Sequence, residues 1–195
     1  MQSFRLTLAS QSPRRAQLLG QAGYQFDVQP ADDGVEGPAD DGETPPDYVS
    51  RSAKEKAANV AAQLASGLVV GCDTVADFAG TILGKPSDRD HAREMLSLLR
   101  GETHHVYSGL CLWQRPDDRS LIRVASSKLK MSNISDDELE NYLDSGAWKG
   151  KAGAFGFQDQ LGWIEILAGD ESTVVGLPLN LLSSMLNEFG LSAPK

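Results

Sequence analysis

Apolar and polar positions alternate at the start of the chain and then change to a helical spacing. The alternation over residues 4–10, FRLTLAS, has the period of two that predicts a strand. Ser12 is suited to cap the helix that follows, Pro13 to occupy its first turn and Gly23 to end it. The stretch YQFDV at residues 24–28 predicts a second strand. The chain therefore opens with a strand, a helix and a strand.

The same exchange of short strands and helices continues along the chain. Residues 30–47 are rich in Pro, Gly and Asp and predict a loop within a domain, because apolar periodicity resumes directly afterwards. One further helix is predicted to begin at Thr44 and Pro45, two more to span residues 88–99 and 135–146, and a last one to begin at Pro178. Further strands are predicted at residues 67–73, in a hairpin over 76–86 with Gly80 at its turn, and at 104–113, 120–131 and 162–167.

This order of elements predicts the fold class. Helices interspersed with apolar strands and one antiparallel meander indicate an α/β or α+β protein with a sheet of mixed strand direction. The length of 195 residues and the hydrophobic content of 41% fit a single domain over residues 1–195.

The charge of the chain narrows the classes of ligand. Lys and Arg number 18 against 27 Asp and Glu, which gives a net charge of -9. Duplex DNA and anionic membranes both require a broad basic face, so we expect neither nucleic acid nor a membrane as partner. A small anion held by a few concentrated cations is still compatible with this charge.

The cysteines indicate the compartment. Cys72 and Cys111 are isolated in apolar runs and are predicted to be buried, reduced thiols, which favours a cytoplasmic protein. No Cys and His spacing typical of a metal site is present. The first ten residues resemble neither a signal peptide nor a transmembrane segment.

The turn after the first predicted strand is a candidate anion site. Ser10 and Ser12 supply hydroxyls, and the helix N-terminus supplies free backbone N–H groups. Arg14 and Arg15 add forked donors that match phosphate oxygens, at a helix end where a cation is unfavourable unless an anion binds there. The alternative is a capped helix with two solvated arginines. No GxxxxGK[ST] sequence is present, which excludes a P-loop.

Acidic residues supply a second candidate site. Asp73 follows the apolar run LVVGC and is predicted to lie at the carboxyl end of its strand, where open α/β sheets bind ligands. Glu36, Asp73 and Asp77 are carboxylates that could hold Mg²⁺. The alternative for Asp73 is a polar turn residue without a chemical role.

Two lysines and a glycine-rich loop complete the candidates. Lys56 lies on the apolar side of its predicted helix, where it either has a chemical role or extends its charge to solvent. Lys85 follows the predicted hairpin. The loop at residues 152–162 contains Gln158, whose amide offers a donor and an acceptor suited to the edge of a nucleobase. No role is assigned to His91, His104 or His105.

Seven stretches together resemble one family. They are LASQSPRRAQLL, YVSRSAKEKA, GCDTV, GTILGKP, LRGETHHVYSG, GKAGAFGFQ and VVGLPLNLL, and they cover the chain from Leu8 to about Leu186. In this order they are similar to the Maf-like nucleoside triphosphate pyrophosphatases. The resemblance implies a mixed α/β fold with two lobes around a deep cleft. It also implies a homodimer and hydrolysis of a nucleoside triphosphate to the monophosphate and pyrophosphate, dependent on Mg²⁺ or Mn²⁺.

The resemblance also implies roles for individual residues. Ser10 and Arg15 fall on the phosphate-binding turn of the family. Lys56 and Lys85 match its two lysines, and Asp73 matches its catalytic carboxylate. Asp73 and Glu36 match the acids of the metal site, Glu36 only with one or two extra residues in the loop before it.

Three residues match the subgroup of the family that acts on dTTP and UTP, namely Arg14, Thr74 and Gln158. Thr81 replaces an acid that is common in the family, so the preferred base stays open. Two alternatives follow. One is the sister subgroup that acts on 7-methyl-GTP, and the other is a regulator of cell division that binds nucleotide without hydrolysing it.

Overall fold

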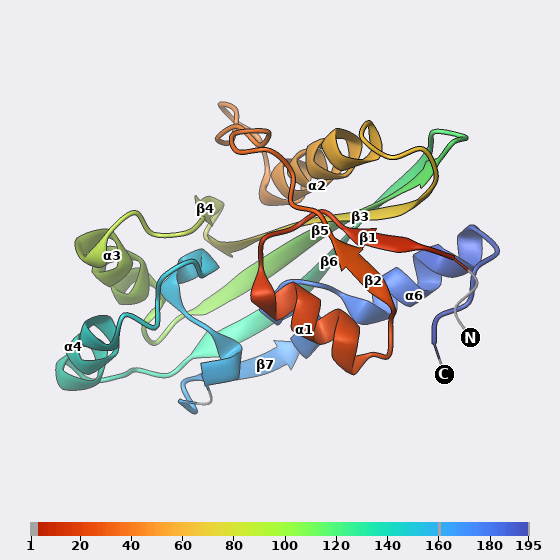
Figure 1. The fold of residues 1–195 in the computed structure, drawn as a ribbon. Helices are drawn as coiled ribbons and strands as arrows, with labels where there is room; N and C mark the ends of the chain where they lie inside the picture. Colours follow the sequence, from red (N-terminus) through yellow and green to blue (C-terminus); the bar gives the residue numbers. More distant parts are fainter. Residues whose placement is uncertain (1–3, 160, 195) are drawn as a thin grey trace.

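A mixed β-sheet forms the centre of the molecule, and helices cover both of its faces (Figure 1). The computed structural model describes residues 4–159 and 161–194. Within these residues the sheet has seven strands: β1 (Leu6–Leu8), β2 (Phe26–Val28), β3 (Gly67–Phe78), β4 (Thr81–Leu83), β5 (Thr103–Arg115), β6 (Arg119–Met131) and β7 (Ile164–Ala168).

The sheet combines parallel and antiparallel pairs. Its order is β2-β1-β3-β5-β6-β7, with β4 paired to β3 off this path. β1 is parallel to both β2 and β3, and the remaining pairs are antiparallel. The prediction of mixed strand direction is therefore confirmed, as are the hairpin with Gly80 in its turn and the antiparallel pair formed by β5 and β6.

The helices begin close to the predicted positions. They are α1 (Pro13–Gln21), α2 (Pro45–Ala61), α3 (Arg89–Leu99), α4 (Asp136–Ser145), α5 (Glu171–Val175) and α6 (Leu179–Glu188), with short 3-10 helices η1 (Ala152–Ala154) and η2 (Phe157–Asp159). Thr44 caps α2 by accepting a hydrogen bond from the Asp47 N–H. Ser135 and Glu138 form the capping box of α4. These caps depend on neighbours in the sequence, which explains why pattern alone located them.

Three expectations about these elements were incomplete or wrong. Ser12 occupies the N-cap position of α1, but its side chain makes no capping hydrogen bond. The five-residue helix α5 was not predicted, because it is too short to show a period. β3 does not end at Asp73 but continues to Phe78, since its second half pairs with both β4 and β5. Asp73 is therefore a mid-strand residue.

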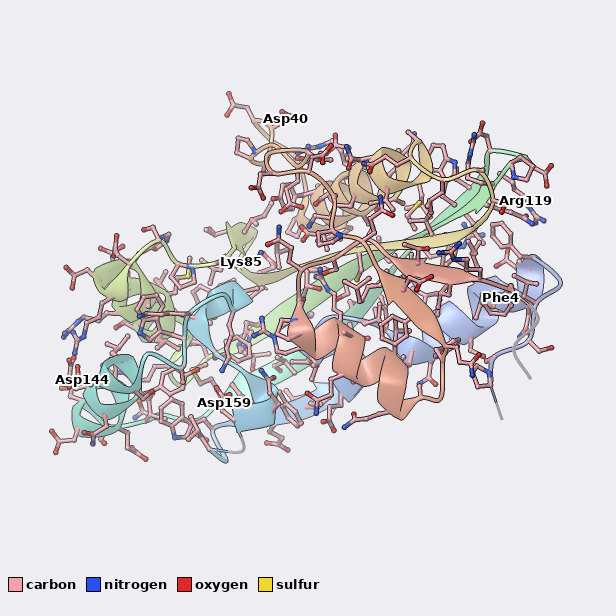
Figure 2. All side chains as sticks on the ribbon, viewed as in Figure 1. Phe4, Asp40, Lys85, Arg119, Asp144 and Asp159 are labelled. Atoms are coloured by element: carbon pink, nitrogen blue, oxygen red, sulfur yellow. The ribbon has the colours of Figure 1, made fainter. Side chains whose placement is uncertain are left out.

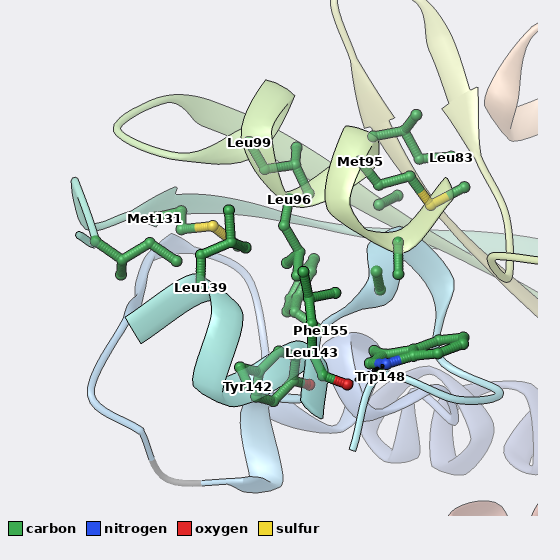
Figure 3. Packing of buried hydrophobic residues seen from close by; sticks show 14 of the residues in the cluster. Leu83, Met95, Leu96, Leu99, Met131, Leu139, Tyr142, Leu143, Trp148 and Phe155 are labelled. Atoms are coloured by element: carbon green, nitrogen blue, oxygen red, sulfur yellow. Dashed lines mark hydrogen bonds between the residues drawn. The ribbon is translucent and has the colours of Figure 1, made fainter. Parts of the chain in front are cut away.

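Three hydrophobic clusters stabilise the sheet. One lies between α3, α4, η1 and the ends of β5 and β6, and includes Leu96, Met131 and Phe155 (Figure 3). A second joins β1 and the first half of β3 to α1 and α6. The third packs α2 on the opposite face of the sheet. Buried, unpaired Cys72 and Cys111 belong to the last two clusters, as expected from the sequence.

The helix α2 approaches the sheet closely because two strand positions are glycines. A Cβ atom on Gly71 would lie 2.2 Å from the carbonyl oxygen of Ala53, and a Cβ on Gly109 would lie 2.1 Å from that of Val49. Both distances are far below van der Waals contact, so neither position accepts a side chain without moving the helix. Within the described chain, every helix is too short or too polar to span a lipid bilayer.

We expect Gly109→Ala to lower the free energy of unfolding by about 1–3 kcal/mol, because the added methyl group must displace α2. Urea unfolding followed by circular dichroism measures this change. Gly20→Ala is the matched control, because Gly20 lies in α1 and a Cβ atom added there would meet nothing within 4 Å. That variant should keep or raise stability, by up to about 1 kcal/mol. Equal destabilisation of both variants would contradict the close approach of α2.

His104 of β5 is a buried histidine that packs edge-on against Phe155, with ring centroids 5.3 Å apart. Neither ring nitrogen has a hydrogen-bond partner among the described residues. Burial lowers the pKa of His104 to about 4. The unfolded chain therefore binds more protons than the folded chain between about pH 4 and pH 6.5, and stability rises with pH across this window.

We expect acidification from pH 6.5 to pH 4 to destabilise the wild type more steeply than His104→Leu, which has no imidazole to protonate. Urea unfolding at a series of pH values measures both slopes. Identical slopes would show that His104 is not held neutral in the fold.

Candidate functional site

A cleft lies beside a stretch of the β3 edge that no described strand covers. β1 pairs with Leu68–Val70 and β4 pairs with Ala76–Phe78, both on the side of β3 that faces away from β5. Between these pairs lies Thr74, which lines a cleft of about 560 Å³. The cleft is lined by the turn before α1 and the start of that helix, the 31–36 loop, α2, Lys85 after β4, the glycine-rich loop and the end of α5.

Arg15 joins three of these elements. Its guanidinium donates to Ser10 Oγ at 3.1 Å, to Thr74 Oγ1 at 3.2 Å and to the carbonyl oxygen of Gly176 at 2.8 Å. Ser108, which sequence reasoning missed, supports this arrangement by a hydrogen bond of 2.7 Å with Thr74 Oγ1. All of these partners are neutral, so the charge of Arg15 is fixed in place without being cancelled.

Further cations border the cleft. Arg14 donates to the carbonyl oxygen of Gly150 at 2.7 Å. Burial lowers the pKa of Arg14, and the charge of the neighbouring Arg15 lowers it further. Lys85 lies two residues after the end of β4, is exposed, and forms no ion pair with a described residue (Figure 2). Lys149 and Lys151, which were not predicted as site residues, also line the cleft. The wall of the cleft is therefore basic, although the chain as a whole is acidic.

A buried lysine and two carboxylates meet on the α2 side of the cleft. Lys56 Nζ lies 2.8 Å from Asp73 Oδ1 and also contacts Glu36 Oε2. Lys56 and Asp73 are 9% and 8% exposed, respectively. Ser52, one helical turn before Lys56, donates to Glu36 Oε2 at 3.3 Å. The i, i+4 spacing of Ser52 and Lys56 was the signal that could have identified this serine.

The charges in this group stabilise one another. Burial alone would raise the pKa of Asp73, but the charges of Lys56 and Arg15 and hydrogen bonds from Lys56 and Ser52 outweigh it and hold the pKa below its ordinary value. Burial lowers the pKa of Lys56, and Arg15 and Lys85 add to that effect against the attraction of Asp73. Asp73 is therefore an ionised carboxylate held next to a cation.

Arg51 of α2 holds the loop that contains Glu36 against this helix. Its guanidinium donates to Glu43 Oε1 at 2.8 Å and Oε2 at 2.7 Å, and to the carbonyl oxygen of Pro38 at 2.9 Å. The hydrogen bonds from Arg51 lower the pKa of Glu43 to about 2. Asp32 and Asn59 form a second pair of hydrogen bonds between this loop and α2. Glu36 is consequently presented to Lys56 by a tethered loop.

The predicted site residues thus converge, with two exceptions. Ser10, Arg14, Arg15, Glu36, Lys56, Thr74, Lys85 and Gln158 all line the cleft. Asp73 does not line the cleft itself, but its carboxylate contacts the ammonium group of Lys56, which does. Asp77, expected as a further metal ligand, instead accepts a hydrogen bond of 2.9 Å from the Gly80 N–H and stabilises the hairpin turn. No group of three or more metal-ligating His, Cys, Asp or Glu side chains occurs in the described chain.

The fold and the cleft define an α/β protein with a site suited to a multiply charged anion. The chain belongs to the Maf-like protein family, whose model matches residues 5–189. The resemblance found in the sequence is therefore confirmed.

Several curated relatives share one name. A protein from Rhodopirellula baltica called dTTP/UTP pyrophosphatase is 51% identical over 191 residues, which cover 97% of this chain and 84% of that protein. A protein of the same name from Dictyoglomus turgidum is 40% identical over 188 residues, 96% of this chain and 97% of the relative. Among solved structures, a HAM1 protein from Coxiella burnetii matches with a TM-score of 0.52 at 14% identity, over 95% of this chain and 99% of that one, and supports the fold alone.

We expect Arg15→Lys to lower the affinity for inorganic tripolyphosphate roughly tenfold, because a lysine ammonium cannot bridge Ser10, Thr74 and Gly176 while facing an anion. Isothermal titration calorimetry measures the affinity. Arg5→Lys is the matched control, since Arg5 is an exposed partner of Asp27 outside the cleft. An unchanged affinity in Arg15→Lys, or an equal loss in both variants, would remove Arg15 from the anion site.

Proposed function

We propose that this chain is a nucleoside triphosphate pyrophosphatase that prefers dTTP and UTP and forms the nucleoside monophosphate and pyrophosphate. The observation that carries the proposal is the ionised Asp73 beside Lys56, next to a cleft whose cations Arg15 and Lys85 have no acidic partner among the described residues. The name shared by relatives that are 51% and 40% identical supports the same activity and the same bases.

The triphosphate is proposed to lie along the open edge of β3. Ser10 and Arg15 bind its oxygens at the α1 end of the cleft. Lys56 on α2 and Lys85 after β4 neutralise the charge of the phosphates from the other sides. Phosphoryl-group chemistry depends mainly on positioning and on stabilising charge, and fixed cations in a partly buried cleft supply both. This arrangement also explains why Arg14 and Arg15 are tolerated at a helix N-terminus, since the ligand brings several negative charges.

Asp73 is proposed to accept the proton of the attacking water. The water oxygen forms a bond to the α-phosphorus, the bond from that phosphorus to the bridging oxygen of the β-phosphate breaks, and pyrophosphate leaves. Because Lys56 covers Asp73, the step requires Lys56 to turn toward the bound phosphates and leave the carboxylate facing the water. An ionised carboxylate is the protonation state that this role needs.

A divalent metal is proposed to bind between Glu36 and Asp73. Their carboxylates already converge on a single cation, the Lys56 ammonium, so the donor geometry suits a positive charge at that point. Mg²⁺ and Mn²⁺ prefer such oxygen ligands and complete their shell with water and substrate phosphates. When bound, the ion polarises a phosphoryl oxygen and stabilises the charge that develops in the transition state.

The preference for dTTP and UTP is proposed to depend on Gln158. Its side chain is exposed, lines the cleft, and makes no hydrogen bond with a described residue, so its amide is available to a ligand. An amide that donates with its NH₂ and accepts with its oxygen complements the carbonyl and N–H edge of uracil and thymine. Arg14 and Thr74, the other residues typical of this subgroup, line the same cleft.

We expect Asp73→Asn to bind nucleotide but to lose turnover by about 10²–10⁴-fold, because the proton acceptor is removed while the cations stay. Pyrophosphate release from UTP with Mg²⁺ or Mn²⁺ measures kcat, and calorimetry with a non-hydrolysable UTP analogue measures binding. Asp77→Asn is the matched control, four residues along the same strand but outside the cleft, and should keep its activity. Full turnover in Asp73→Asn would exclude Asp73 from the chemistry.

The same assay separates the two alternatives. Release of pyrophosphate from dTTP and UTP at higher kcat/KM than from 7-methyl-GTP supports the proposal, and the reverse order assigns the chain to the sister activity. Nucleotide binding without pyrophosphate release in either metal would instead favour a non-hydrolytic regulator.

A further inference from the structure

The glycine-rich loop closes on a largely buried ion pair that the proposed chemistry does not use. Lys151 Nζ donates to Asp159 Oδ1 at 2.6 Å and also contacts Oδ2. The side chain of Lys151 is 9% exposed and that of Asp159 is 18% exposed. Lysine and aspartate are rarely buried unless they are paired, so each residue depends on the other for its position. Lys151 lines the cleft, whereas Asp159 lies behind it.

Tyr142 anchors this ion pair to α4. Its hydroxyl donates to Asp159 Oδ2 at 2.9 Å, and its ring packs edge-on against Trp163 at a centroid distance of 5.2 Å. Burial, followed by the hydrogen bond to Asp159, raises the pKa of Tyr142. The hydroxyl thus keeps its proton, and the Asp159 carboxylate accepts hydrogen bonds from two different elements.

Gln158 packs against the same point as the ion pair. A Cβ atom on Gly156 would lie 2.7 Å from Lys151 Nζ, 2.8 Å from Gln158 Nε2 and 2.9 Å from Asp159 Oδ2. The Asp159 N–H also donates to the carbonyl oxygen of Gly156 at 3.1 Å, which closes η2 around Gln158. The Gln158 amide, the Lys151 ammonium and the Asp159 carboxylate therefore all lie close to Gly156.

The orientation of the Gln158 amide determines which base it can recognise. One orientation complements the hydrogen-bonding edge of uracil and thymine, and the orientation with NH₂ and oxygen exchanged complements that of cytosine. A neighbouring ammonium and carboxylate give the two ends of the amide different surroundings, so they favour one orientation. A fixed orientation also reduces the entropy lost when the base binds.

We propose that Asp159 is a positioning residue for base recognition: by holding Lys151 and Tyr142, it orients the Gln158 amide toward the base. This inference rests on the proposed function, because it assigns Gln158 to the base of a nucleotide.

The test is Asp159→Asn, which keeps the size of the side chain and an acceptor for Tyr142 but removes the charge that holds Lys151. We expect the KM for UTP to rise about tenfold with kcat changed less than about twofold, and the preference for UTP over CTP to fall roughly tenfold. Inhibition by inorganic tripolyphosphate, which has no base, should stay within about twofold of the wild type, since the phosphate ligands are untouched.

Two further variants make the result specific. Tyr142→Phe removes one hydrogen bond to Asp159 and should shift the same quantities in the same direction by a smaller factor. Asp137→Asn, an exposed residue on α4, is the surface control and should leave them unchanged. Thermal unfolding of each variant reports whether it folds, and Tyr142→Phe carries the test if Asp159→Asn does not.

A lower kcat with an unchanged KM, an unchanged UTP preference, or a loss of tripolyphosphate inhibition equal to the change in KM would each overturn the inference. If the wild type hydrolyses no triphosphate, the proposed function fails separately. Calorimetry with α,β-imido UTP, α,β-imido CTP and tripolyphosphate then makes the same comparison, because a base-dependent loss of affinity in Asp159→Asn does not require turnover.

Discussion

The close packing of α2 on β3 and β5 is the constraint on which the site depends. Gly71 and Gly109 leave no side chain between the helix and the sheet, so carbonyl oxygens of α2 lie where Cβ atoms would otherwise be. At this separation Lys56 reaches Asp73 at 2.8 Å, and both charges are buried together. A larger separation would leave two buried charges apart, which is strongly unfavourable. The interface between α2 and the sheet thus determines both the packing of the helix and the contact between Lys56 and Asp73.

The cleft lies where the edge of β3 has no partner strand. β1 is short and β4 begins late, so they pair with the two ends of β3 and leave this edge of its middle without a partner strand. Lys56 and Glu36 border the gap from one face of the sheet, and Arg15 borders it from the other. A chain of net charge -9 thereby concentrates cations at one place, which favours a compact polyanion over an extended one.

Sequence reasoning predicted what depends on neighbouring residues and missed what depends on tertiary contacts. The starts of α2 and α4 follow from Thr44 and Ser135, which cap their own helices. The predicted end of β3 was wrong because a polar Asp73 interrupts the apolar run, while pairing with β5 carries the strand onward. Motifs identified most of the cleft residues, and the spacing of Ser52 from Lys56 was a further signal, yet the pairing of Lys151 with Asp159 became visible only once the chain was folded.

A crystal structure of the chain with α,β-imido UTP and Mn²⁺ would show whether the triphosphate binds against the middle of β3. We expect the triphosphate at the middle of β3, with the α-phosphate beside Lys56 and Asp73 and the remaining phosphates between Arg15 and Lys85. A nucleotide bound elsewhere, or one whose phosphates lie away from Asp73 while α2 keeps its place on the sheet, would contradict it.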